Sequence, residues 1–203
     1  EKRQYSLAFK FLLKAYDILD KLDIDDNEGE TYELSFSIIN ACSDIIMCME
    51  ESERIDAFDL LKQFLDNIRY YYDRVDILQV FFNSLKGEDF LKLQLDFVKE
   101  QLDYIDSHND ILDREYVLDD FAKMYLNLLK KNNVSNQEIN VAYKKYWKCD
   151  SIRMDCVFTC INNKEYDKAL DYIDKCIDLD YENQTLMKRD IELKKDIYKT
   201  GKH

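Results

Sequence analysis

Apolar residues recur every three or four positions along most of this chain, which is the spacing of one face of an α-helix. The clearest stripe lies in residues 163–180, where charged residues cover the opposite face. A polar turn at 162–164 and another apolar segment precede it. The pattern predicts a helical hairpin whose second helix presents the small residue Ala169 to a neighbouring helix. The stripe consists of Tyr166, Ala169, Leu170, Ile173, Cys176 and Ile177.

The same spacing predicts ten helices joined by short polar loops. Ser52 is the expected cap of the third helix, and Ser135 with Glu138 forms a capping box for the seventh. The expected inward-facing side chains include Tyr5, Ala15, Leu34, Ile55 and Tyr116. The helices are expected near residues 3–22, 31–50, 53–70, 73–85, 88–107, 111–131, 136–147, 150–161 or 151–161, 166–180 and 183–199.

Turn-forming residues are scarce, because the chain has no Pro and only 3 Gly among its 203 residues. Sheet proteins need these residues in their tight turns, so the composition favours helices. Short loops make antiparallel neighbours the expected arrangement of consecutive helices. The predicted fold is therefore an all-α, right-handed stack of antiparallel helix pairs. It is expected to form a single domain over 1–203, with a division into 1–107 and 108–203 as the alternative.

The chain carries 42 acidic and 29 basic residues, a net charge of −13 that is spread along the helix faces. Such a surface repels nucleic acids and anionic membranes, so binding to either is not expected. No apolar run approaches the roughly 18 residues of a membrane span, and no signal peptide is visible. The expected compartment is the cytoplasm. The first residue is Glu1 rather than Met, so we expect a fragment of a longer protein.

The acidic loop, residues 23–30, contains the beginning of a calcium-binding pattern. Asp23, Asp25 and Asn27 alternate as the first three ligands of an EF-hand loop do. The pattern then fails, because Gly29 comes one place late and Leu34 stands where a bidentate Glu is required. The sequence therefore predicts a solvated loop between helices and leaves cation binding there open.

The six cysteines contain no Cys-x-x-Cys pair. Cys156 and Cys160 are four positions apart on one helix face, and Cys149 and Cys176 could lie near them in the hairpin. Four thiols could hold zinc, although structural zinc sites usually draw their ligands from Cys-x-x-Cys turns. Reduced thiols buried in the core are the expected role, and neither a metal nor a cofactor is expected.

Catalytic motifs are absent from the sequence. His108 lies in a polar linker and His203 at the end of the chain, so neither has the apolar surroundings of a general base. No GxSxG, phosphate-binding Gly loop or HExxH occurs. Residues 70–72 are three consecutive tyrosines that cannot all face one core, so they cover the core's edge or leave a ring for another contact. No catalytic residue is expected.

The second helix of the predicted hairpin resembles the second helix of a tetratricopeptide repeat. Tyr166, Ala169, Ile173 and Cys176 stand where that repeat has Tyr, Ala, a bulky apolar residue and a small residue. Tyr181 takes the place of the terminal Pro, and the preceding helix lacks the Trp and Leu-Gly signature. The resemblance covers about one repeat of such an array.

A second resemblance covers most of the chain. It rests on Phe11 to Leu22, the acidic loop, Ala57-Phe58, Lys92 to Ile105, Arg153, Lys164 to Ala169, and Leu193 to Tyr198. In the order of these segments the chain resembles the helical region of bacterial SWIM zinc-finger proteins. No Cys-x-Cys and no Cys-x-His occurs here, so the zinc ligands of that family and its nucleic-acid binding correspond to no residue of this sequence.

The SWIM resemblance implies a non-catalytic helical scaffold that mediates protein contacts beside a zinc finger outside this sequence. The first alternative is a tetratricopeptide-like regulatory domain that binds a peptide in a concave groove. The second alternative, an enzyme, is expected only if a buried cluster of titratable residues surrounds one pocket. The partner and the oligomeric state are left open.

Overall fold

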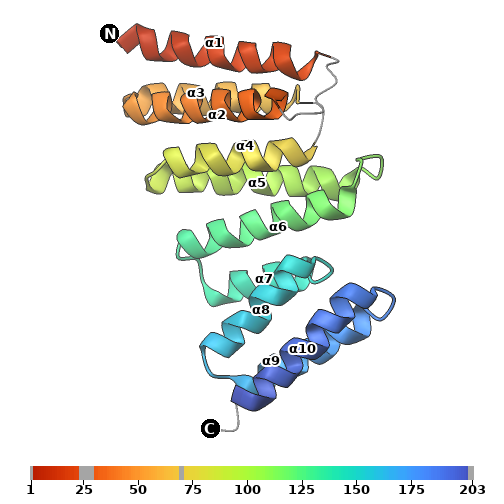
Figure 1. Ribbon diagram of the computed structural model, residues 1–203. Helices are drawn as coiled ribbons and strands as arrows, with labels where there is room; N and C mark the ends of the chain where they lie inside the picture. The colour runs from red at the N-terminus through yellow and green to blue at the C-terminus, as the bar shows by residue number, and fades with distance from the viewer. Residues whose placement is uncertain (1, 23–29, 69–70, 201–203) are drawn as a thin grey trace. The chain divides into compact units, whose positions relative to one another are not determined.

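The computed structural model describes residues 2–22, 30–68 and 71–200, with the side chains of 2–3 and 71–72 left aside. Ten α-helices and no strand are found in these ranges (Figure 1), which confirms the predicted all-α fold class. The predicted helix boundaries agree with the observed ones to within three residues, except that the third helix, expected to reach residue 70, ends at Leu65. The helices are α1 (Lys2–Asp20), α2 (Glu30–Cys48), α3 (Glu51–Leu65), α4 (Tyr71–Ser84), α5 (Glu88–Ser107), α6 (Arg114–Lys131), α7 (Asn136–Lys145), α8 (Asp150–Asn162), α9 (Tyr166–Leu179) and α10 (Gln184–Thr200).

The chain divides into two compact units, Glu1–Val117 and Leu118–His203. The boundary lies inside α6, whereas the sequence pointed to the polar linker that precedes this helix. Helical hydrogen bonding continues through the boundary, so no loop marks it. Whether the two units form one domain stays a prediction.

The first unit is held together by helices α1 to α5 and their aromatic side chains. α1 packs against α2 and α3, and α2 packs against α4. Phe9 of α1 meets Phe81 of α4 edge to face, with 6.0 Å between the ring centroids. Phe58 of α3 meets Phe97 of α5 in the same way at 6.1 Å. Such edge-to-face pairs fix the orientation of helices that are distant in sequence.

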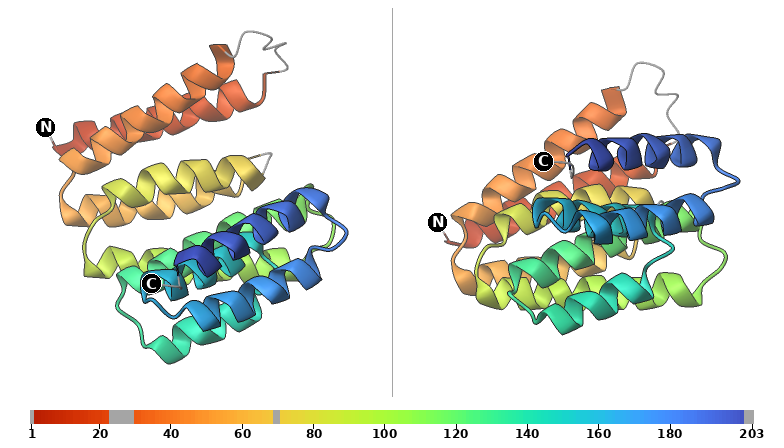
Figure 2. Two further views of the ribbon diagram at one scale, coloured as in Figure 1. Left: turned by 60° about the horizontal axis from the view of Figure 1, so that its bottom comes forward. Right: turned by 90° about the horizontal axis from the view of Figure 1, so that it is seen from below.

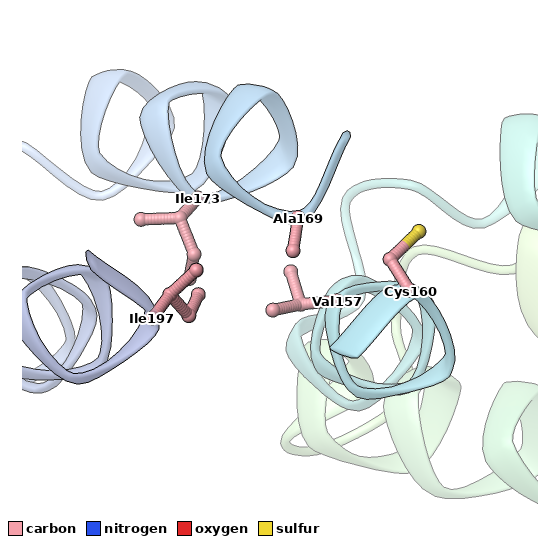
Figure 3. Close-up of a cluster of buried hydrophobic side chains, with 5 residues drawn as sticks. All are labelled: Val157, Cys160, Ala169, Ile173 and Ile197. Atoms are coloured by element: carbon pink, nitrogen blue, oxygen red, sulfur yellow. The ribbon is translucent and has the colours of Figure 1, made fainter. Parts of the chain in front are cut away.

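The second unit is built around the predicted hairpin, which is confirmed. α8 packs against α9, and α9 packs against α10, its neighbour in both views of Figure 2. Ala169 and Ile173 of α9 are completely buried. Ala169 faces Val157 of α8, and Ile173 faces Ile197 of α10 (Figure 3). The stripe of α9 therefore forms the centre of this small core, as its spacing indicates.

The helix ends follow the sequence signals in one case and depart from them in another. The Ser135 amide donates to the Glu138 carboxylate at 3.1 Å, and the Glu138 amide donates to Ser135 Oγ at 3.3 Å, which confirms the predicted capping box. Ser52 does not cap α3, because the helix already begins at Glu51. The Glu53 carboxylate instead accepts a hydrogen bond from the Glu50 amide.

Five of the expected inward-facing side chains are exposed instead. Three of them, Tyr5, Leu34 and Ile55, lie near the beginnings of their helices, at the fourth or fifth position. Periodicity indicates which face turns inward but not how far the neighbouring helices extend along it. Ala15 and Tyr116 lie to the side of the stripes that are buried, and Tyr116 is 79% exposed. These stripes are Phe9, Leu13 and Tyr16 in α1, and Val117, Phe121, Met124 and Leu128 in α6.

Candidate functional site

A hollow of about 410 Å³ lies between α1, α2 and α4 in the first unit. It opens to solvent, since Tyr32 and Phe36 at its border are 65% and 47% exposed. We refer to it as the acidic pocket. Its polar and aromatic border consists of Tyr16 and Asp20 from α1, Tyr32 and Phe36 from α2, and Asp73 and Asp76 from α4.

Each of the three helices contributes two border residues that are three or four positions apart. This spacing places both side chains of a pair on the same face of a helix. In α2 the result is visible in the rings of Tyr32 and Phe36, which stack with 6.4 Å between centroids and 13° between planes. Asp20 follows Tyr16 by one helical turn, and Asp76 follows Asp73 in the same way. The acidic pocket therefore forms where regular helices α1, α2 and α4 pack so that the faces carrying these pairs point toward one another.

The electrostatics of the acidic pocket are dominated by its carboxylates. Burial, and to a smaller degree the charges of Asp20 and Asp76, together raise the pKa of Asp73 from 3.8 to about 6. No Lys, Arg or His is found among the described residues that line the hollow. The described lining therefore carries negative charge and no cation, which is an arrangement suited to binding a positive group.

The hydroxyl of Tyr16 belongs to the same site. Tyr16 is 7% exposed, and its ring packs edge to face against Phe64 of α3 at 5.3 Å. Burial raises the pKa of Tyr16, and the charges of Asp73, Asp20 and Asp76 raise it too. Within residues 2–22, 30–68 and 71–200, no hydrogen bond satisfies this hydroxyl. Tyr16 lines the open hollow, and its hydroxyl is not among the fully buried atoms without a partner, so a ligand or water that enters the hollow can bond to it.

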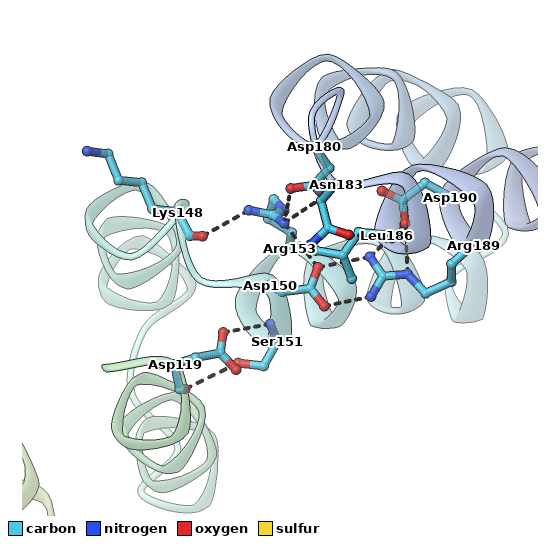
Figure 4. A network of polar contacts seen from close by, with 10 residues as sticks. All are labelled: Asp119, Lys148, Asp150, Ser151, Arg153, Asp180, Asn183, Leu186, Arg189 and Asp190. Carbon is cyan, nitrogen blue, oxygen red and sulfur yellow. Dashed lines mark hydrogen bonds and ion pairs between the residues drawn. The ribbon is translucent and has the colours of Figure 1, made fainter. Parts of the chain in front are cut away.

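A second cluster of charged residues lies in the other unit and connects α8 with the end of α9 (Figure 4). Its centre is Arg153, whose side chain is 3% exposed. The guanidinium donates to both oxygens of Asp180, at 2.9 and 2.7 Å, and to Asp150 Oδ1 at 3.1 Å. It also donates to the Lys148 carbonyl at 2.9 Å. These bonds tie the beginning of α8 to the residue that follows α9.

Arg189 of α10 extends this cluster. It donates to both oxygens of Asp150, at 2.6 and 2.9 Å, and twice to Oδ1 of the completely buried Asp190. Burial favours a higher pKa for Asp150, but the hydrogen bonds and charges of Arg189 and Arg153 lower the pKa overall. Every carboxylate of the cluster has an arginine partner. We interpret the cluster as a clamp that fastens three helices together.

The sequence contained a signal for this clamp that the periodicity argument missed. Arg153 directly follows the buried Ile152 and precedes the buried Cys156 by three positions, so it lies on the inward side of α8. Asp190 precedes the buried Ile197 by seven positions, which is two helical turns. A charged residue that falls on an apolar stripe indicates a buried ion pair, because such residues are rarely buried unpaired.

The cysteines occupy the walls of the helical core. Cys149, Cys156, Cys160 and Cys176 are buried, whereas Cys48 is exposed at the end of α2 and does not fit the expectation that all six are core thiols. Burial raises the pKa of Cys176 to about 12 and that of Cys156 to about 11. Thiolates, the form that binds zinc, are therefore disfavoured there. In the ranges that the structure describes, no group of three metal-ligating residues could hold an ion.

The remaining predicted candidates do not join a site. His108 follows α5 and stacks on Tyr104, with 3.9 Å between the ring centroids. Its Nδ1 lies 2.9 Å from the Tyr104 carbonyl oxygen. Outside the described residues lie positions 23–29 of the acidic loop, Tyr70 with the side chains of its two tyrosine neighbours, and His203.

Comparisons with known proteins add no further candidate. No family model, no curated protein and no solved structure matches this chain. Over 2–22, 30–68 and 71–200, no helix combines the length and the apolar character that crossing a membrane requires. The acidic pocket and its surroundings are therefore the candidate functional site of this chain.

Proposed function

We propose that this chain is a non-catalytic helical interaction domain that binds a segment of another protein at the acidic pocket. The observation that carries the proposal is the mouth of this pocket, where Leu22, Tyr32 and Phe36 leave about half or more of their surface in water. Exposed aromatic side chains beside a hollow are typical of protein-binding surfaces. The charged pocket inside this apolar mouth supplies the polar specificity that such a surface needs.

A second exposed apolar surface supports an interaction role. Leu7, Phe11 and Ile18 of α1 are 54%, 66% and 53% exposed, and their offsets of 0, 4 and 11 place them on one face of the helix. Single exposed apolar residues are common on protein surfaces, whereas a set aligned on one helix face is typical of an interaction surface.

This interaction role can take either of the two forms expected from the sequence. One is a scaffold like the helical region of SWIM zinc-finger proteins, and the other is a tetratricopeptide-like peptide receptor. Both are non-catalytic, and both use a helical surface to hold a protein segment. They differ in what accompanies the domain. The sequence of the complete gene distinguishes them, since the first version requires a Cys-x-Cys and a later Cys-x-His beside this chain.

Selection from a random peptide library displayed on phage tests the proposed function. Peptides enriched by the parent protein are expected to bind Phe36→Ala much more weakly, because this change removes half of the stacked pair at the mouth. The matched control is Phe158→Ala, since Phe158 of α8 is 49% exposed and Phe36 is 47% exposed. Failure to enrich any peptide, or equal binding to both variants, would contradict the proposal.

An enzyme is the second candidate, favoured by the pKa of Asp73. A carboxyl group with a pKa of about 6 is partly protonated near neutral pH and could act as a general acid. Asp20 and Asp76 beside it could then serve as the second carboxylate that many hydrolases use. Turnover of chromogenic glycosides or esters by the parent, lost in Asp73→Asn, would establish this candidate in place of the first.

A further inference from the structure

We propose that the acidic pocket accepts the cationic side chain of a lysine or arginine from the bound protein segment. This inference rests on the proposed function and specifies the chemistry of its partner. Four features of the pocket support it: the acidic character of its described lining, the hydroxyl of Tyr16, a stacked aromatic wall and its size.

The first feature is the missing positive charge. Asp20, Asp73 and Asp76 repel one another, and the described lining of the pocket contains no basic residue. The clamp in the other unit shows how this chain treats a similar set of carboxylates when they are structural. There, Arg153 and Arg189 bind all three of its carboxylates directly. The described lining of the acidic pocket has the acids of such a cluster but no arginine, so a partner can supply one.

The second feature is the hydroxyl of Tyr16. The residue is more than nine-tenths buried, and its hydroxyl feels the charges of all three carboxylates. Among the residues that the structure describes, none accepts its proton or donates to its oxygen. An ammonium or guanidinium group carries several N–H donors, so it can bond to this oxygen and to a carboxylate together.

The third feature is the wall formed by Tyr32 and Phe36, whose rings stack nearly in parallel. Aromatic faces attract organic cations, and arginine stacks on them especially well. A metal ion would gain nothing from such a wall, because calcium and magnesium require six or more oxygen ligands. The described residues offer no group of three that could hold a metal ion. The pocket therefore fits an organic cation better than a metal.

The fourth feature is the size of the hollow. Its volume of about 410 Å³ falls in the range of pockets that hold small organic molecules. The side chain of lysine or arginine is smaller than such molecules. It can enter while the rest of the partner segment stays outside, against Leu22 and Phe36 at the mouth.

Titration with side-chain analogues tests the inference without a known partner. The 15N-labelled protein is titrated with n-butylguanidinium and n-butylammonium chloride at constant ionic strength, and amide chemical shifts are followed by NMR. We expect shifts centred on α1, α2 and α4 around the acidic pocket, with millimolar dissociation constants because the probes have few atoms. Neutral n-pentanol, a control of similar size, is expected to produce no comparable shifts. The ratio of the two dissociation constants shows whether the pocket prefers a guanidinium or an ammonium group.

Two variants with the same change in net charge identify the site. Asp73→Asn is expected to weaken binding of both cations about tenfold, because one carboxylate of the site is neutralised. Asp167 is an exposed residue of α9, so Asp167→Asn is expected to leave the affinity for both cations unchanged. Equal affinities in the two variants, shifts away from the pocket, or binding of n-pentanol as strong as that of the cations would overturn the inference. So would a calcium titration that gives tighter binding at the same amides.

The result also separates this inference from the function on which it rests. If phage selection yields peptides that depend on Phe36 but contain no basic residue, and the cations do not bind, the inference fails and the interaction role stands. If the cations bind but no peptide is enriched, the proposed partner is wrong and both statements fall. Enriched peptides with a recurring Lys or Arg, together with cation binding, support both.

Discussion

Asp73 is expected to lower the free energy of unfolding near neutral pH. Its pKa is about 6 in the folded protein and about 3.8 in an unfolded chain. The folded state therefore binds more protons between these values, and the free energy of unfolding falls as pH rises through that window. The loss is nearly complete about one pH unit above this pKa, where Asp73 is ionised in both states. A residue that costs stability in a pocket is more readily explained by function than by folding.

Replacement of Asp73 by Asn is predicted to stabilise the protein at pH 7.5 and to leave it nearly unchanged at pH 4. The expected gain at pH 7.5 is on the order of 1 kcal/mol, less than the full pKa shift implies because the pocket opens to solvent. Urea unfolding of parent and variant at both pH values measures it. Asp167→Asn serves as the control, and destabilisation of Asp73→Asn at pH 7.5 would count against this electrostatic account.

Ala169 tests the close packing of the hairpin. Its side chain is completely buried and faces Val157 of α8 (Figure 3), so the extra atoms of Ala169→Leu have no space. Overpacking of this kind costs roughly 1–3 kcal/mol, whereas the helix propensities of Ala and Leu differ by far less. The exposed Asp171→Leu on the same helix should change stability by less than about 0.5 kcal/mol. A neutral Ala169→Leu in urea unfolding would show that α9 does not approach α8 closely.

Single residues were predictable from the sequence where one helix alone determines their place. Ala169 and Ile173 were identified correctly because the stripe of α9 repeats without interruption over the helix. Tyr116 was misplaced because two overlapping apolar stripes run along α6, and only packing selects between them. Asp73 could not be distinguished among 42 acidic residues, since its unusual pKa depends first on burial by the packed helices and then on Asp20, which is more than fifty positions away.

At the scale of elements, the clamp around Arg153 holds α8, α9 and α10 together. Arg153→Met would leave Asp180, whose side chain is 10% exposed, without its cation. The predicted loss of stability is about 3–5 kcal/mol, since an uncompensated buried charge is expensive. Urea or thermal unfolding monitored by circular dichroism measures this loss.

A double variant distinguishes the charge from the packing. Arg153→Met with Asp180→Leu removes both partners, so much of the lost stability is expected to return. The exposed pair Lys199–Asp196 supplies the control, because Lys199→Met should cost at most about 1 kcal/mol. A double variant as unstable as the sum of its single variants would show that the two residues act separately.

The elements themselves were the most predictable feature of this chain. All ten helices follow from apolar spacing and from the near absence of Gly and Pro, and Ser135 marks the beginning of α7 as its capping box indicates. The acidic pocket was not predictable, because each helix contributes only an ordinary pair of side chains. Its existence depends on how α1, α2 and α4 are packed, which periodicity does not specify. The clamp was partly predictable, since Arg153 interrupts an apolar face.

For the whole molecule, the net charge of −13 predicts no binding to duplex DNA at physiological salt. Phosphate contacts gain affinity by releasing counterions, and this requires a basic surface. Fluorescence anisotropy of a labelled duplex at roughly 150 mM salt measures the affinity of the protein for DNA. Micromolar affinity under these conditions would reveal a basic surface strong enough to outweigh the net charge.

The pH dependence of cation binding tests most directly the claim that the acidic pocket is the functional site. Ionised Asp73, together with Asp20, Asp76 and the hydroxyl of Tyr16, faces the proposed cation. The affinity for n-butylammonium, measured by NMR from pH 5 to pH 8, is predicted to rise as Asp73 loses its proton near pH 6 and then to level off. Asp73→Asn should bind weakly and show no such rise. An affinity that is independent of pH, or a rise that persists in Asp73→Asn, would contradict the account.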